Sequence, residues 1–169
     1  MRSNSKVWKI IRPDVNLKTV DDFLNALKAR RVIIGSWAWD IMSHPIFFQS
    51  IVEANLDQEY ELFILNTSQL IGKQGGGTTA EVFASAEQLY LEKCPAWVGP
   101  MLRIDYNDQP AGRRLIIGME PVNSPHGRLV FCLDREGFDL LLRGGNGEPK
   151  HLWRRGDSQW VFCRPYKSR

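Results

Sequence analysis

Five of the six charged side chains between Val98 and Val122 are candidates for a functional site, in a segment that the sequence predicts to be two β-strands joined by a turn. They are Arg103, Asp105, Asp108, Arg113 and Glu120. If the two strands pair, Arg103 and Glu120 can be cross-strand neighbours joined by a bidentate ion pair. The same charges could instead form a pocket for a charged ligand, because the guanidinium group of arginine matches the geometry of carboxylates and phosphates.

The carboxylates of this segment suggest a further alternative, which is catalysis. Asp105, Asp108 and Glu120 could act as general acid and base in a small hydrolase or transferase, provided that they converge in a concave pocket. No serine-nucleophile, zinc-protease, dinucleotide-binding or metal-ligand motif accompanies them. The sequence therefore assigns no catalytic residue, no metal and no cofactor, and it leaves enzymatic activity unsupported.

A second candidate site lies near the C-terminus, where basic and aromatic residues are interleaved. Its residues are Trp153, Arg154, Arg155 and Arg164. Residues 111–169 carry a net charge of +5, whereas the rest of the chain carries −2. Such a combination is typical of surfaces that bind nucleic acid, although tryptophans in strands more often belong to a core. Nucleic-acid binding is therefore an alternative function, and its affinity should fall steeply with salt.

The length and composition are those of one globular domain that spans residues 1–169. Of the 169 residues, 43% are hydrophobic and 24% are charged, which is ordinary for a soluble protein. No apolar run approaches the ~20 residues of a membrane span, and the N-terminal segment does not fit a signal peptide. We therefore expect a cytoplasmic protein with no membrane partner. We expect reduced, mostly buried thiols at Cys94, Cys132 and Cys163.

Helical patterns dominate the first part of the chain, from about residue 17 to 94. Apolar side chains recur there at the spacing of one helix face, and cap residues precede them. The predicted elements are a helix at 19–30 capped by Thr19, short helices within 32–52 that break at His44 and Pro45, a strand at 59–67, and a helix that follows the cap residue Thr78.

The later part of the chain, from about residue 97 to 166, alternates apolar and polar residues, which favours β-strands. The predicted strands are 101–106, 114–122, 128–134, 138–143 and 159–164. Short strands joined by turns rich in Gly, Pro and Asn are typical of an antiparallel sheet. The predicted fold class is α+β, with N-terminal helices packed on a C-terminal antiparallel sheet that is either a meander or a partly open barrel.

A longer pattern covers residues 31–122. Its matching positions are Cys94, Pro95, Val98, Gly99, Pro100, Leu102, Arg103, Tyr106, Asp108, Gln109, Pro110, Glu120 and Pro121. With these residues the segment resembles a family of small uncharacterised bacterial proteins, whose pattern runs roughly E-L-C-P-x-x-V-G-P-x-L-R-L-x-Y-x-D-Q-P and continues to a strand ending in M-E-P. Lys93 stands where that family has leucine, and Trp97 stands where an acidic residue is usual. The resemblance implies no particular activity.

Together these patterns favour a binding module. We expect it to contact a protein partner, or a second copy of itself, through the charged face that carries Arg103, Asp108 and Glu120. Nucleic-acid binding around Trp153 is the alternative, and catalysis by the carboxylates is the second alternative.

Overall fold

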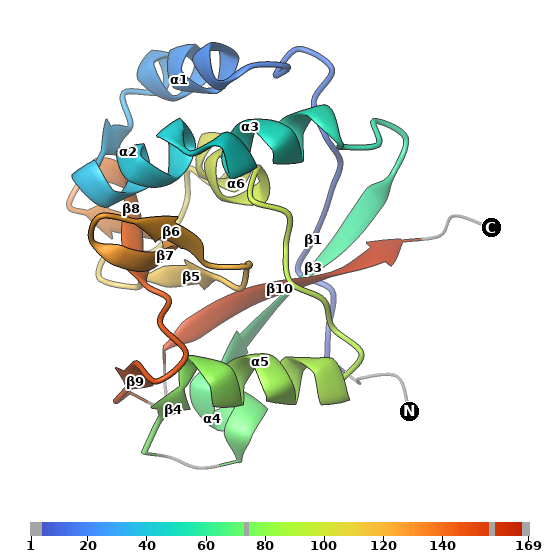
Figure 1. Ribbon diagram of the computed structural model, residues 1–169, viewed down its shortest axis with the longest axis vertical. Coiled ribbons are helices and arrows are strands. Elements are labelled where there is room, and N and C mark those ends of the chain that lie inside the picture. The colour runs from blue at the N-terminus through green and yellow to red at the C-terminus, as the bar shows by residue number, and fades with distance from the viewer. Residues whose placement is uncertain (1–4, 73–74, 156–157, 167–169) are drawn as a thin grey trace.

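A mixed β-sheet that does not close on itself organises the fold (Figure 1). The computed structural model describes residues 5–72, 75–155 and 158–166. In spatial order the strands of the main sheet are β1 (Lys9–Ile11), β3 (Glu59–Asn66), β10 (Gln159–Tyr166), β5 (Leu115–Ile117), β7 (Gly127–Glu136), β8 (Asp139–Asn146) and β2 (Ile33–Ile34), and β6 (Val122–Ser124) pairs with β7. A small second sheet joins β4 (Gly77–Thr78) to β9 (Leu152–Trp153). The chain is therefore α+β, as predicted, and its sheet is open.

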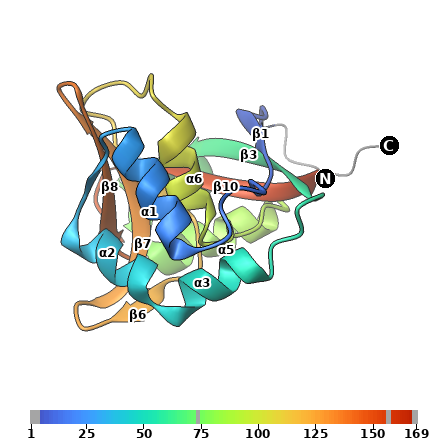
Figure 2. The same ribbon diagram turned by 90° about the horizontal axis from the view of Figure 1, so that it is seen from above.

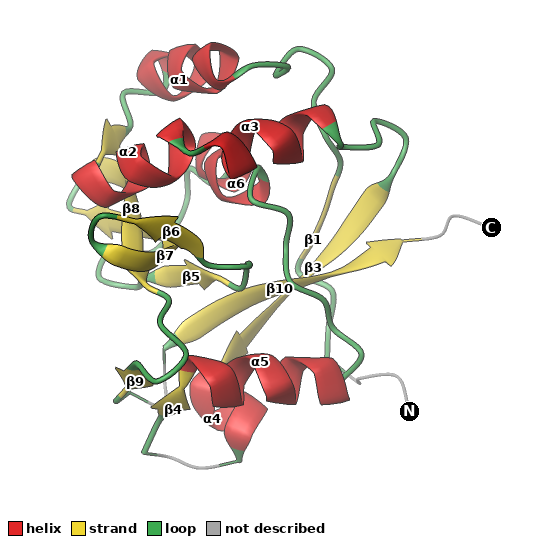
Figure 3. Ribbon diagram, viewed as in Figure 1, coloured by secondary structure: helices red, strands yellow, loops and turns green. Residues whose placement is uncertain are grey.

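The described residues form six helices in two groups. Figure 2 looks down onto the first group, and Figure 3 shows the two groups at opposite ends of the sheet. The first group is α1 (Val20–Ala29), α2 (Ser36–Ser43), α3 (Pro45–Val52) and α6 (Val98–Asp105), and the second is α4 (Thr67–Ile71) and α5 (Thr79–Gln88). Both α2 and α6 contact β7 and β8. None of these helices combines the length and apolar character that crossing a membrane requires.

The predicted helix starts are confirmed, and local hydrogen bonds explain them. The Thr19 side chain accepts a hydrogen bond from the backbone N–H of Asp22 at 3.1 Å, which caps α1. Between α2 and α3, Nδ1 of His44 accepts the N–H of Ile46 at 3.1 Å, so His44 caps the second helix at the predicted break. Thr78 caps α5 in the same way.

The predicted antiparallel meander is only partly confirmed. Strands β6, β7 and β8 pair antiparallel in chain order. The last strand, β10, does not continue this meander, because it pairs antiparallel with β3 and parallel with β5. Its central position suits its composition, since residues 160–163 are all buried and a strand covered on both faces is continuously apolar. Because β1, β2 and β3 join the sheet, the predicted order of helices first and sheet last holds only in part.

The predicted strand at 101–106 is wrong, because α6 occupies this segment. Val98 and Leu102 are both buried and lie four residues apart, which is the spacing of one helix face. Pro100 costs no hydrogen bond, since it lies in the first helical turn, where backbone N–H groups have no partner within the helix. Without this strand the predicted central hairpin does not form, and β5 pairs with β7 and β10 instead.

The three thiols are free and buried, as predicted. Burial raises the pKa of Cys132 to about 12. Burial also raises the pKa of Cys94, and the neighbouring Cys163 adds to this effect. The raised pKa values make the thiols of Cys94 and Cys132 unreactive at neutral pH, because the thiolate is the reactive form.

We expect alkaline pH to destabilise the fold through these thiols. A thiol with a raised pKa contributes its full stabilisation below its unfolded-state pKa of about 9 and loses it as the pH rises through its folded-state value, about 12 for Cys132. Above pH ~9 each such thiol should lower the free energy of unfolding by about 1.4 kcal/mol per pH unit. Urea titrations of the wild type and Cys132→Ala measure this slope. The variant should lose stability less steeply, and equal slopes would contradict the expectation.

Candidate functional site

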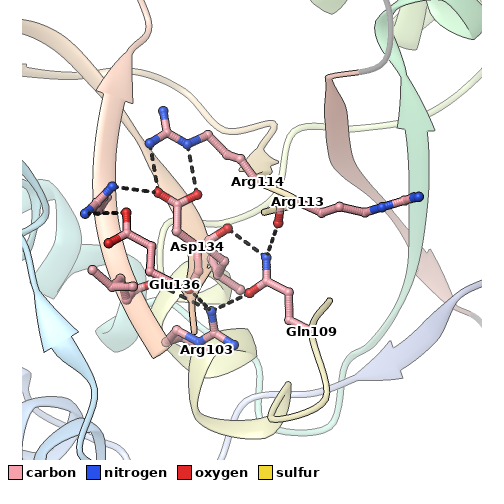
Figure 4. A network of polar contacts seen from close by, with 9 residues as sticks. Arg103, Gln109, Arg113, Arg114, Asp134 and Glu136 are labelled. Atoms are coloured by element: carbon pink, nitrogen blue, oxygen red, sulfur yellow. Dashed lines mark hydrogen bonds and ion pairs between the residues drawn. The ribbon is translucent and has the colours of Figure 1, made fainter. Parts of the chain in front are cut away.

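Arg103 lies in the interior between α6 and the hairpin of β7 and β8 (Figure 4). Its Nη1 atom donates to Oε1 of Gln109 at 2.6 Å and to the carbonyl oxygen of Asp134 at 3.1 Å. Its Nη2 atom donates to the carbonyl oxygen of Tyr106. Burial lowers the pKa of Arg103 to about 10. Because the side chain is 0% exposed, the prediction that it faces outward is wrong.

Gln109 completes this buried contact. While Oε1 accepts from Arg103, Nε2 donates to the carbonyl oxygens of Arg113 at 2.7 Å and Leu133 at 2.9 Å. The amide therefore joins the loop after α6 to β7, and both of its polar atoms have partners. The hydrogen bonds of Arg103 and Gln109 therefore hold α6 against the sheet.

A chain of ion pairs covers the outer side of the same hairpin (Figure 4). Arg114 binds Asp134 with two hydrogen bonds, from Nε at 2.9 Å and from Nη2 at 2.8 Å. Arg143 bridges Asp134 at 3.3 Å and Glu136 at 3.0 Å. The hydrogen bonds to Asp134 raise the pKa of Arg114, so its guanidinium group stays charged. Because Asp134 is nearly buried, the pairing compensates its lost hydration.

The predicted pair between Arg103 and Glu120 does not form. Glu120 is exposed and pairs instead with Lys93, at 2.8 Å between Oε2 and Nζ. Asp105 and Asp108 are also exposed, at the end of α6 and in the loop that follows it. None of the three carboxylates lines the cleft described next, so it provides no convergence of acids of the kind that the hydrolase alternative requires.

A cleft of about 730 Å³ brings together residues from both predicted sites. We call it the arginine cleft and define it by Arg113, Arg114, Ile116, Trp153, Arg154 and Arg155. The side chain of Arg113 extends away from the Asp134 ion pairs (Figure 4). It comes from the segment before β5, whereas Trp153 ends β9, about forty residues later. Parallel pairing of β5 with the start of β10 places these segments beside each other.

Hydrogen bonds to the start of α5 hold the wall that carries Trp153. The N–H of Thr79 donates to the carbonyl oxygen of His151 at 3.1 Å, and Nε1 of Trp153 donates to Oγ1 of Thr79 at 2.9 Å. The Trp153 ring packs edge-on against Trp160, with 5.1 Å between ring centroids. At Gly76, where φ is +84°, an added Cβ would lie 1.9 Å from the Trp153 carbonyl oxygen, so this contact requires glycine.

The arginine cleft is strongly cationic. Four arginines line it, and no Asp or Glu is present among the described residues of its lining. Arg113 and Arg154 are exposed, whereas Arg114 is partly neutralised by Asp134. Besides the arginines, the lining includes the apolar side chains of Ile116, which is buried, and Trp153, which is half-buried. The cleft can therefore hold an anion that also carries a flat or apolar part.

Arg164, the fourth predicted nucleic-acid residue, lies outside the cleft. Its Nη2 pairs with Glu61 at 2.7 Å, and its guanidinium carbon lies 4.9 Å from the centre of the Phe63 ring. Sequence reasoning did not single out Arg114 or Ile116. Arg113 and Arg114 are adjacent and precede an apolar strand, and this pair was the signal available in the sequence. Neighbouring side chains of an extended segment point to opposite faces, so the two arginines of such a pair differ in their surroundings.

Within the described part of the chain, no group of three or more His, Cys, Asp or Glu side chains is placed to hold a metal ion. No protein-family model, curated protein or solved structure matches this chain. The resemblance of residues 31–122 to a family of small bacterial proteins therefore stays a prediction.

Proposed function

We propose that this protein binds single-stranded nucleic acid in the arginine cleft. The single observation that carries the proposal is the meeting of Arg113 and Arg114 with Trp153, Arg154 and Arg155 around one cavity without an acidic residue in its described lining. Phosphodiester groups are the natural ligands of such arginines, because each guanidinium can donate two parallel hydrogen bonds to phosphate oxygens.

The shape of the cleft supports a nucleotide-sized occupant. Its volume of about 730 Å³ lies within the range usual for small-ligand sites, about 300–1,000 Å³. The apolar side chains of Ile116 and Trp153 suit contact with a base, while the arginines suit the phosphate backbone of the nucleic acid. A base must be unpaired from its duplex to contact these side chains, so the proposed ligand is a single strand.

The test is fluorescence anisotropy of a labelled single-stranded oligonucleotide titrated with the full chain over a series of salt concentrations. Arg113→Ala and Arg154→Ala should each weaken binding about tenfold, since each removes a charge-assisted hydrogen bond. Each should also lower the slope of log affinity against log salt by about 0.7, the value for one phosphate contact on a single strand.

Arg30→Ala is the matched control, because it removes one exposed positive charge at the end of α1, outside the cleft. It should change the affinity by less than either cleft variant. The matching duplex and inorganic phosphate serve as competitors. Equal effects of Arg30→Ala and Arg113→Ala would contradict the proposal, as would displacement of the oligonucleotide by inorganic phosphate alone.

Binding through the charged segment around Arg103 has less support, because its central arginine is buried and both of its Nη atoms donate to acceptors on the protein. We assign no catalytic residue. As part of the proposal we place the binding in the cytoplasm, which the three free cysteines support, since thiols persist in reducing compartments.

A further inference from the structure

An apolar groove opens between α3 and the segment that precedes α1. Its volume is about 210 Å³, and its lining includes Pro13, Leu17, Val52 and Leu56 above the buried ring of Trp97. Among the described residues, this groove shares none with the arginine cleft. It is large enough for an apolar side chain from another molecule.

One side of the groove, which we call its bank and which consists of Phe48, Val52 and Leu56, also projects into solvent. Val52, at the end of α3, is 64% exposed, and Phe48, one turn earlier on the same helix, is about half exposed. Leu56 continues this bank beyond the helix and is about half exposed as well. Monomeric proteins keep contiguous apolar patches small, so a recess flanked by protruding apolar side chains indicates an interaction surface.

The charges on the rim indicate which partner covers this surface. Asp14 and Lys18 both line the groove, so one patch carries both signs of charge. In a dimer with two-fold symmetry, the same patch faces itself, and residue i of one copy meets residue j of the other. Asp14 of each copy can then face Lys18 of its partner, while the protruding bank of one copy enters the recess of the other.

We propose that this groove is the interface of a symmetric homodimer. The patch is self-complementary in both shape and charge, as a symmetric interface between two identical copies requires. The inference goes beyond nucleic-acid binding and does not depend on it, because the two surfaces have separate residues.

The test measures the monomer–dimer equilibrium of the full chain by sedimentation across a series of protein concentrations. The wild type should form a concentration-dependent dimer. Val52→Glu should raise the dissociation constant by about a hundredfold or more, because symmetry places two like charges in an apolar interface. The control is Phe138→Glu, since Phe138 is 97% exposed in the turn between β7 and β8 and lies outside the groove. It should leave the dimer unchanged.

A charge exchange provides a second test that does not depend on the apolar residues. Asp14→Lys and Lys18→Asp should each weaken the dimer, because each places like charges opposite one another. The double exchange Asp14→Lys with Lys18→Asp should restore it. A wild type that stays monomeric at every concentration would overturn the proposal. So would a dimer whose dissociation constant is unchanged by Val52→Glu and by both single exchanges.

Discussion

Arg103→Ala is expected to lower the free energy of unfolding by about 3 kcal/mol. The substitution leaves Oε1 of Gln109 and the carbonyl oxygen of Asp134 without the guanidinium group that donates to them in this buried site. Each orphaned buried acceptor costs about 1–3 kcal/mol, and the space left by the side chain adds a cavity penalty. Relief from burying a charge returns part of this loss, as the lowered pKa of Arg103 indicates. The total remains a large fraction of the stability of an ordinary domain, about 5–15 kcal/mol.

Urea denaturation of the wild type and the variant measures this loss. Arg113→Ala is the matched control, because it removes an exposed arginine ten residues away and should change stability by less than about 0.5 kcal/mol. A double-mutant cycle with Arg103→Ala and Gln109→Ala should show strong coupling between the two positions, because the two side chains are hydrogen-bond partners. Equal stabilities of Arg103→Ala and Arg113→Ala would mean that the buried contact is not what holds α6 to the sheet.

The helix caps and the C-terminal hairpins could be predicted from the sequence because local residues determine them. Thr19, His44 and Thr78 each bond to a backbone group within three residues, so their roles depend on neighbours in the chain. The turn between β6 and β7 is equally local. Such contacts need no knowledge of the rest of the fold, and the sequence pattern is sufficient to place them.

The misassigned segment at 98–105 shows where local reasoning stops. The run around Leu102 and Ile104 alternates apolar and polar residues, yet it also places Val98 and Leu102 on one helix face. In the helical conformation Arg103 donates to acceptors on β7 and in the following loop, and the local sequence pattern gives no sign of these contacts. An arginine with buried acceptors cannot be distinguished from a surface arginine by its neighbours in sequence.

Four of the six residues that define the arginine cleft could be predicted from the sequence, but their assembly into one site could not. Arg113 and Trp153 were singled out for two different sites, and nothing local connects them. They meet because β10 inserts between β3 and β5 instead of following β8. A parallel pairing of this kind is non-local, so neither strand carries a signal of it.

Trp160→Ala is expected to cost about 3–5 kcal/mol and to weaken binding in the cleft as well. The side chain is fully buried at the start of β10, packed edge-on against Trp153 and Phe83, and its Nε1 donates to Oγ1 of Thr67 at 3.1 Å. Removing the ring leaves a large cavity directly behind Trp153. Because Trp153 belongs to the cleft wall, its loss of support should lower the affinity for the oligonucleotide even under conditions where the variant is still folded.

Trp160→Phe separates packing from hydrogen bonding. Phenylalanine retains an aromatic ring against Trp153 but cannot donate to Thr67, so it should cost only about 1 kcal/mol for the lost bond and some packing. Thr67 still donates to the carbonyl oxygen of Ser158 at 3.3 Å, which limits the penalty. Urea denaturation and oligonucleotide binding, measured together, should show a large loss of both for Trp160→Ala and a small loss of both for Trp160→Phe. If Trp160→Ala remained folded and bound with wild-type affinity, the wall at Trp153 would not depend on this ring, and the geometry of the cleft would have to be set by the hydrogen bonds to Thr79 alone.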